Sequence, residues 1–205
     1  HLCIGFTGCA DGNETADLGR EGICIEDTEN ELSAELTAEE QEYFTEFANM
    51  KENNGFLLSQ YEEVSKADLN EILYNGAGIE SDPLSEEERK AYEAKAYPVE
   101  SDITRLTTEQ IDAFLQRKAG ISMADMEGSL DWVYLDMWDS YVFQHGDTNF
   151  CTFVCTGGTR TGKVFELHLK AAEEYVSDCI VTLEKNGDDY QFVSNRFCEN
   201  AGDIR

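Results

Sequence analysis

The residues best suited to chemistry lie in one short stretch of the chain. His145 and Asp147 are two positions apart in the segment 145–149, and Asp136 and Asp139 precede them. A histidine that a carboxylate orients can act as a general base, as in hydrolases. Asp, Thr and Asn in such a segment are equally typical of a turn in which their side chains bond to the backbone. The pattern favours the turn and leaves a His145/Asp147 acid-base site as the alternative.

Seven cysteines offer a second kind of chemistry: Cys3, Cys9, Cys24, Cys151, Cys155, Cys179 and Cys198. Cys151 and Cys155 are four residues apart on an expected strand, about 13 Å, which is too far for a disulfide between them. A metal site would need two more ligands, and His1, His145 and His168 have no recognised spacing to supply them. Acidic surroundings would raise the pKa of a Cys151 or Cys155 nucleophile. We therefore predict free thiols rather than a metal centre or a nucleophile.

Two further loops resemble ligand sites only in part. The segment 11–22 spaces Asp and Asn like a calcium loop, but Ala16 and Gly22 stand where such a loop needs Gly and Glu. The segment 157–163 has the composition of a phosphate loop, yet Val164 follows its lysine where Ser or Thr is required. The sequence therefore indicates no metal and no cofactor.

Aromatic residues are concentrated just before the segment 145–149. They are Trp132, Tyr134, Trp138, Tyr141 and Phe143. Such a group can stack on a sugar, with Trp132 and Trp138 as the candidate binding residues, or it can pack between helices and a sheet. The sequence favours packing and leaves the sugar platform open.

Helix signals precede these residues along the chain. Capping boxes at 37–40, 85–88 and 107–110 predict three helix starts, and apolar patterns at 54–61 and 65–75 add short helical segments. Gly76, Pro98 and Gly120 end three of these patterns. Four or five short helices are therefore expected within 37–127.

Strand signals dominate the last third. Alternating or β-branched segments at 150–156, 163–170, 178–184 and 190–195 predict four strands, with turns at 157–162 and 186–187. Consecutive strands with tight connections form an antiparallel meander. Helices followed by strands indicate an α+β fold, in which the N-terminal helices pack on the C-terminal meander.

The second strand pattern, 163–170, assigns the two faces of the sheet. If Phe165, Leu167 and Leu169 face the helices, Glu166 and His168 must face away, because neighbouring side chains of a strand point in opposite directions. A polar outer face is either plain solvent-facing surface or a shallow recognition surface, for which Glu166 and His168 are candidate binding residues.

The charge of the chain limits its partners. Its 205 residues contain 43 acidic and 15 basic side chains, a net charge of -28. Such a chain repels nucleic acid and anionic lipid surfaces, and is compatible with cations, basic proteins or neutral glycans. Residues 1–104 have a net charge of -20, with much of the excess near the N-terminus. We interpret 1–36 as an acidic arm or tether and 37–205 as a single α+β domain, helical over 37–127 and a sheet over 128–205.

The N-terminal segment suggests a location. Phe6-Thr7-Gly8-Cys9 has the form of a bacterial lipoprotein processing box, which makes Cys9 a candidate lipidation site. The apolar stretch before it is shorter than the roughly 7–15 residues of a signal segment. The alternative is that these residues begin the folded domain. No apolar run approaches the roughly 20 residues that cross a bilayer.

Several stretches together resemble an uncharacterised domain of secreted lipoproteins from Gram-positive gut bacteria. They are LTAEE at 36–40, YVFQHGDTN at 141–149, VTLE at 181–184 and YQFVSN at 190–195. The resemblance covers about residues 36–197 and implies a cell-surface location without an assigned activity.

These observations predict a non-catalytic, extracytoplasmic binding module for a protein or glycan, anchored through lipid on Cys9. A hydrolase that uses His145 and Asp147 is the alternative. A cytosolic acidic regulator that masks a basic partner is a third possibility.

Overall fold

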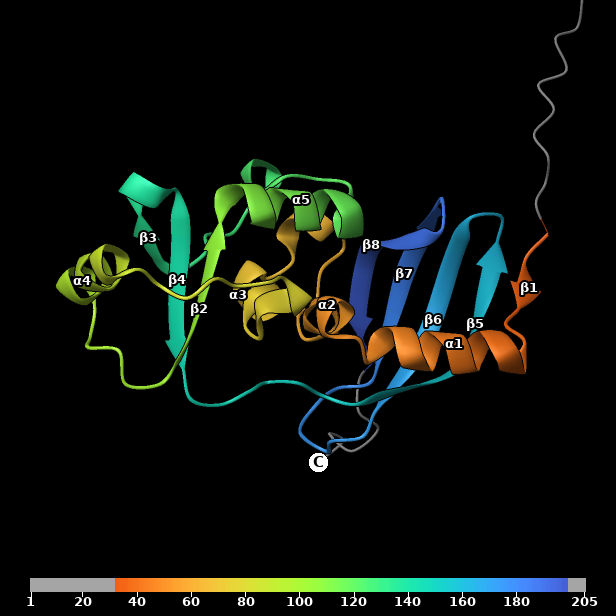
Figure 1. The fold of residues 1–205 in the computed structure, drawn as a ribbon. Coiled ribbons are helices and arrows are strands. Elements are labelled where there is room, and N and C mark those ends of the chain that lie inside the picture. The colour runs from red at the N-terminus through yellow and green to blue at the C-terminus, as the bar shows by residue number, and fades with distance from the viewer. Residues whose placement is uncertain (1–31, 199–205) are drawn as a thin grey trace, which may run out of the picture. The chain divides into compact units, whose positions relative to one another are not determined.

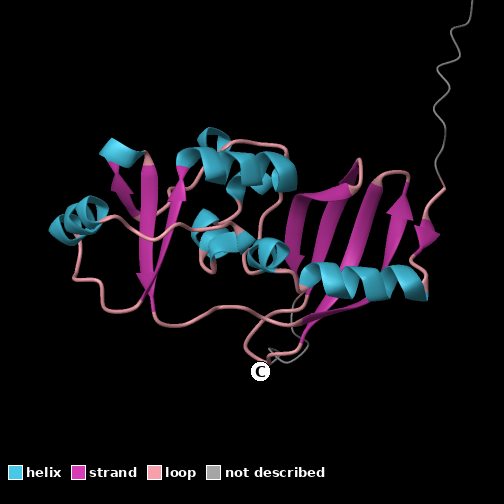
Figure 2. Ribbon diagram, in the orientation of Figure 1, coloured by secondary structure: helices cyan, strands magenta, loops and turns pink. Residues whose placement is uncertain are grey.

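The computed structural model describes residues 32–198 and confirms the predicted α+β fold. Five short α-helices lie in its first part (Figure 2): α1 (Ala38–Ala48), α2 (Lys51–Asn54), α3 (Leu69–Leu73), α4 (Glu86–Lys95) and α5 (Thr108–Ala119). The predicted capping boxes begin α1, α4 and α5, with Thr37, Ser85 and Thr107 as the N-cap residues. In each box the cap hydroxyl accepts a backbone N–H of the first turn, which offsets the unpaired donors at a helix start.

The C-terminal strands form a five-stranded antiparallel sheet in the order β1-β5-β6-β7-β8 (Figure 1). Its strands are β1 (Ala34–Glu35), β5 (Phe153–Thr161), β6 (Val164–Ala171), β7 (Cys179–Asn186) and β8 (Asp189–Phe197). The last four strands are the predicted meander, and β1 adds a short edge beside β5.

The first turn of the meander is shorter than predicted. The segment 157–162 does not form a turn, because β5 continues as far as Thr161 and only Gly162 and Lys163 connect it to β6. The pairing of β5 with β6 has a bulge between Cys155 and Gly157 and is regular again from Gly157 onward. Gly158 has φ of 146°, and a Cβ on it would overlap the backbone oxygen of Glu166. Glycine at this position therefore lets β5 approach β6 closely, so that the strand continues where a loop was predicted.

A second sheet, which the sequence analysis did not anticipate, has the order β2-β4-β3. Its strands are β2 (Asp102–Thr107), β3 (Val133–Leu135) and β4 (Ser140–His145). β2 lies within the segment expected to be helical, and its partner β4 follows more than 30 residues later. One face of this sheet packs on α4 around a small cluster of Tyr92, Leu135 and Val142.

The faces of the large sheet follow the predicted alternation. Phe165, Leu167 and Leu169 are at most 4% exposed, whereas Glu166 and His168 lie on the outer face. Helix residues complete the main core from the inner side. Burying this apolar surface is the dominant favourable contribution to the fold.

Side chains of α1 and α2 complete the edge of the large sheet. Backbone N–H groups of Cys155, Phe153 and Cys151 donate to Thr45 Oγ1, Asn49 Oδ1 and Asn54 Oδ1 at 2.9, 3.0 and 3.1 Å. These donors are alternate residues of one chain segment, so they point to the same side. We call these three bonds the edge ladder. It holds α1 and α2 against β5, as a neighbouring strand would.

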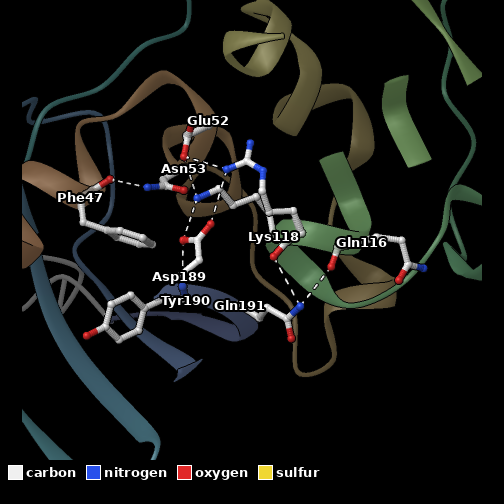
Figure 3. A network of polar contacts seen from close by, with 9 residues as sticks. Phe47, Glu52, Asn53, Gln116, Lys118, Asp189, Tyr190 and Gln191 are labelled. Atoms are coloured by element: carbon white, nitrogen blue, oxygen red, sulfur yellow. Dashed lines mark hydrogen bonds and ion pairs between the residues drawn. The ribbon is translucent and has the colours of Figure 1, made fainter. Parts of the chain in front are cut away.

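A buried ion network joins α5 to α2 and to β8 (Figure 3). Lys118 is 1% exposed, and its Nζ lies 2.7 Å from Glu52 Oε1 and 3.1 Å from Asp189 Oδ1. Its ammonium group also lies 5.5 Å from the centre of the Phe47 ring. Arg117 adds a second cation to both carboxylates. The network therefore compensates a lysine charge that would otherwise be costly to bury.

The carboxylates of this network have shifted pKa values. Burial alone would raise the pKa of Glu52 and of Asp189, but hydrogen bonds and the charges of Lys118 and Arg117 outweigh it and lower both values. A backbone hydrogen bond from Tyr190 also lowers the pKa of Asp189.

None of the helices between residues 32 and 198 is long and apolar enough to cross a membrane.

The edge ladder predicts the effect of a nearly isosteric change. Thr45→Val removes the acceptor for the Cys155 N–H and should lower the free energy of unfolding by about 1–3 kcal/mol. Thr45→Ser retains the hydroxyl, and its free energy of unfolding should fall by less than half as much as that of Thr45→Val. Urea denaturation of both variants measures the difference, and equal losses would show that packing, not the hydrogen bond, holds α1.

The ion network predicts a pH-dependent contribution to stability. Glu52 and Asp189 have lowered pKa values in the fold, so their contribution is present above the unfolded values of 4.5 and 3.8 and is lost as pH falls through the lower folded values. Lys118→Met should lower the free energy of unfolding at pH 7 by about 2–3 kcal/mol, less than for fully buried pairs because both carboxylates are a third exposed. The variant should also lose less stability than the parent as the pH falls from about 5 to about 3. Thermal unfolding across pH tests this, and parallel curves would contradict it.

Candidate functional site

A cleft with aromatic and acidic walls lies between α3 and the three-stranded sheet. It has a volume of about 230 Å³, and we call it the aromatic cleft. Its walls are Asn70, Glu71, Tyr74, Asp131, Trp132 and Phe143. The residues 145–149 continue from β4 beside it. The cleft thus brings together Trp132 and the neighbourhood of His145 and Asp147, which the sequence analysis considered separately.

The rings at the cleft come from β4, from the residue before β3 and from the end of α3. Phe143 and His145 are two residues apart on β4, and their ring centres lie 5.2 Å apart at an interplanar angle of 18°. Trp132 directly precedes β3, whose Val133 pairs with Val142, and its ring stacks on Phe143 at 5.2 Å and 15°. Tyr74 of the α3 end contacts Phe143 at 5.3 Å and His145 at 5.1 Å. These contacts form a continuous aromatic wall.

Amide side chains hold the two sides of the cleft together. Asn70 Nδ2 donates to the Ser129 carbonyl at 3.0 Å, and Asn70 Oδ1 accepts the Asp131 N–H at 2.8 Å. On the other side, Asn149 Nδ2 donates to Glu71 Oε2, and Asn75 Nδ2 donates to Asn149 Oδ1 at 3.3 Å. α3 is therefore tied to the segments before β3 and after β4.

His145 and Asp147 lie together, but not as a histidine oriented by a carboxylate. His145 Nδ1 lies 2.6 Å from the backbone oxygen of Asp147, so Nδ1–H donates to a carbonyl. The Asp147 carboxylate instead accepts the Tyr74 hydroxyl at 2.7 Å. This arrangement is that of a turn with its own side-chain bonds. His145 Nε2 has no hydrogen bond to any described residue.

The cleft has a negative electrostatic character. Burial and the charge of Asp68 raise the pKa of Glu71, and the hydrogen bond from Asn149 only partly offsets them. The hydrogen bond to Asp147 raises the pKa of Tyr74, with smaller contributions from burial and from the charges of Asp147 and Glu71. None of the ion pairs within residues 32–198 includes Glu71, Asp131 or Asp147.

The nearby thiols are poor nucleophiles. Cys151 and Cys155 are each 5% exposed, and Cys155 faces the core. Burial raises the pKa of both, and the charges of Glu173 and Glu71 raise that of Cys151 further. Each thiol is protonated at neutral pH and largely shielded from solvent.

The five aromatic residues named from the sequence do not form one platform. Trp132 is 6% exposed and lies in the main core beside the cleft, whereas Trp138 packs against the small cluster with α4. Tyr134 and Tyr141 form a separate cross-strand pair with ring centres 4.8 Å apart. Only Trp132 and Phe143 contribute to the aromatic cleft.

Glu166 and His168 lie on the outer face of the large sheet, away from the cleft. Their side chains are about half exposed, and His168 Nε2 lies 3.6 Å from Glu166 Oε1. Glu166 pairs across the sheet with Thr182, which pairs with Ser194. These three side chains line a shallow depression of about 290 Å³ that also includes Arg196. Most of its walls are polar, and Tyr61 and Ile180 are the aromatic and apolar residues among them.

Sequence reasoning missed Glu71 and Tyr74. Glu71 is on α3 and Tyr74, three residues later, is its C-terminal cap in helical conformation, so they share a helix face, which was a local signal. Their partners, Asn149 and Asp147, lie more than 70 residues later, and no spacing rule connects them. Within residues 32–198, no group of three His, Cys, Asp or Glu side chains is placed to hold a metal ion.

Comparisons with models of known protein families, with characterised proteins and with solved structures found no match to this chain. The resemblance to a lipoprotein domain therefore stays a prediction, as does lipidation of Cys9, which lies outside the described residues.

The geometry of His145 predicts its tautomer. In the neutral form of the ring, the proton should reside on Nδ1 because the Asp147 carbonyl accepts it. Asp147→Asn leaves that carbonyl in place and should not change the tautomer. Long-range nitrogen–proton NMR spectra distinguish the two ring nitrogens, and an Nε2–H form, or a switch in the variant, would contradict this geometry.

Proposed function

We propose that the domain is a non-catalytic, extracytoplasmic binding module for a protein or glycan ligand, anchored through Cys9, and that its ligand occupies the aromatic cleft. The observation that carries the proposal is the convergence of rings, carboxylates and amides in one cavity. Concave sites with a few converging polar groups are the usual places for ligands.

The chemistry beside the cleft favours binding over catalysis. A general base needs an oriented ring, and here the Asp147 carboxylate is bonded to Tyr74 rather than to His145. The thiols nearby are buried and have raised pKa values. A hydrolase that uses His145 and Asp147 therefore has less support than a binding module.

Location follows from separate considerations. The processing-box pattern before Cys9 and the resemblance to secreted lipoproteins support a cell-surface position. Metabolic labelling of the native protein with a lipid precursor tests it, and an unlabelled Cys9 would contradict the anchor without bearing on the cleft.

Fluorescence of Trp132 provides a direct test of binding. The chain has two tryptophans, so Trp138→Phe leaves Trp132 as the only one. We expect cell-wall glycan fragments or peptide pools to change its fluorescence in a saturable way and to shift the amide resonances of Asn70 and Phe143. Tyr74→Leu should weaken the response by about fivefold or more, because it removes one aromatic wall worth about 1 kcal/mol.

Glu166→Gln is the matched control, since it alters the other candidate surface on the outer sheet face. Loss of binding in this variant but not in Tyr74→Leu would contradict the assignment to the cleft. Turnover of an ester or glycan substrate that disappears in His145→Ala would instead support the hydrolase.

A further inference from the structure

We propose that the aromatic cleft binds an alkylammonium group, either the head of a lysine side chain or that of a small organic amine. This inference rests on the proposed function, because it names the ligand class of the same site. It follows from the charge, the walls and the size of the cleft.

The carboxylates at the cleft indicate that its ligand is positively charged. Glu71 and Asp131 line the cavity, and Asp147 lies at the Tyr74 hydroxyl on its border. Within residues 32–198, no lysine, arginine or histidine forms an ion pair with any of these three carboxylates. An anion would be repelled here, whereas a cation would gain energy that a neutral ligand would not.

Several cations of the domain form ion pairs away from the cleft. Arg105 pairs with Glu88 at 2.6 Å, Lys95 with Asp136 at 2.8 Å, and Arg160 with Glu40 at 3.0 Å. Lys118 and Arg117 belong to the buried ion network. The net charge of -28 adds a long-range attraction for cationic ligands.

The walls favour an alkylammonium over a metal ion. Tyr74, Trp132 and Phe143 supply aromatic surface, which attracts organic cations through the ring quadrupole and buries their methylene or methyl groups. A hard metal ion would need several oxygen ligands around one point, and the described side chains provide no such group. Rings beside carboxylates therefore match a cation with an apolar surface.

The size of the cavity favours a head group over a whole ligand. Its volume of about 230 Å³ is below the roughly 300–1,000 Å³ typical of sites for drug-sized molecules. One end of a longer molecule can enter while the rest remains outside.

The test compares charged and neutral probes of similar shape. Tetramethylammonium chloride and N-acetyl-lysine methylamide are titrated into the Trp138→Phe chain at constant ionic strength, with tert-butyl alcohol and N-acetyl-norleucine methylamide as neutral counterparts. Trp132 fluorescence and amide shifts report binding. We expect the charged probes to bind at least about fivefold more tightly than the neutral ones, because only the charged probes gain a cation–π contact and the attraction of a nearby carboxylate.

Variants that each remove one carboxylate show where in the domain the preference for charged probes arises. Glu71→Gln should weaken binding of the charged probes by about fivefold and leave the neutral probes unchanged. Asp131→Asn, at an exposed position, makes the same test with little effect on folding. Asp188→Asn is the control, because it changes the net charge equally at an exposed residue of the β7–β8 turn. Equal losses in all three variants would overturn the proposal, since a long-range field alone would then explain the binding.

Other outcomes separate this inference from the proposed function. Equal binding of charged and neutral probes would overturn the proposal of a cationic ligand. Binding of a glycan in the cleft without binding of the amines would do the same. Both results leave the proposed binding module intact. No cleft response to any probe, glycan or peptide overturns both. Tighter binding of lysine peptides than of free amines assigns the head group to a protein partner, and equal binding assigns it to a small amine.

Discussion

The edge ladder is the interaction on which the placement of the remaining elements depends. A strand edge with unpaired N–H groups must find partners. Here Thr45, Asn49 and Asn54 provide acceptors for alternate residues of the segment 151–155. Asn54 fixes Cys151, and Asn149, two residues earlier, bonds to Glu71 on α3. The same helix-to-strand contacts that complete the large sheet therefore also hold the segment after β4 beside the aromatic cleft.

A shortage of cations explains the electrostatic contrast within the domain. The chain has 15 lysines and arginines for 43 carboxylates. Several of these cations are committed to structural contacts, above all Lys118, which is almost fully buried between Glu52 and Asp189. Carboxylates at the cleft have no such partner among the described residues. The cleft is thus negative because none of the ion pairs among the described residues lies at it.

Local signals predicted much of the fold. The capping boxes at Thr37, Ser85 and Thr107 located three helix starts, because the bonds involved span only three residues. Alternation in β6 assigned the inner and outer faces, because side-chain direction in a strand has a period of two. The continuation of β5 past Gly158 was missed, since composition alone does not distinguish a glycine within a strand from one in a turn. The second sheet was missed because its pairing joins distant segments.

Residue patterns alone predicted the α+β order, the helix starts, the faces of the meander and the acidic character. They also placed His145, Asp147 and Trp132 among the residues to consider. Tertiary structure decided that Trp132 and Trp138 lie apart, that Asp147 bonds to Tyr74 rather than to His145, and that α3 forms a wall of the cleft. The difference lies in how far apart along the chain the contacting residues are. Caps and alternation arise within a few residues, whereas the cleft depends on contacts between residues more than 70 positions apart, which form only when the whole domain packs.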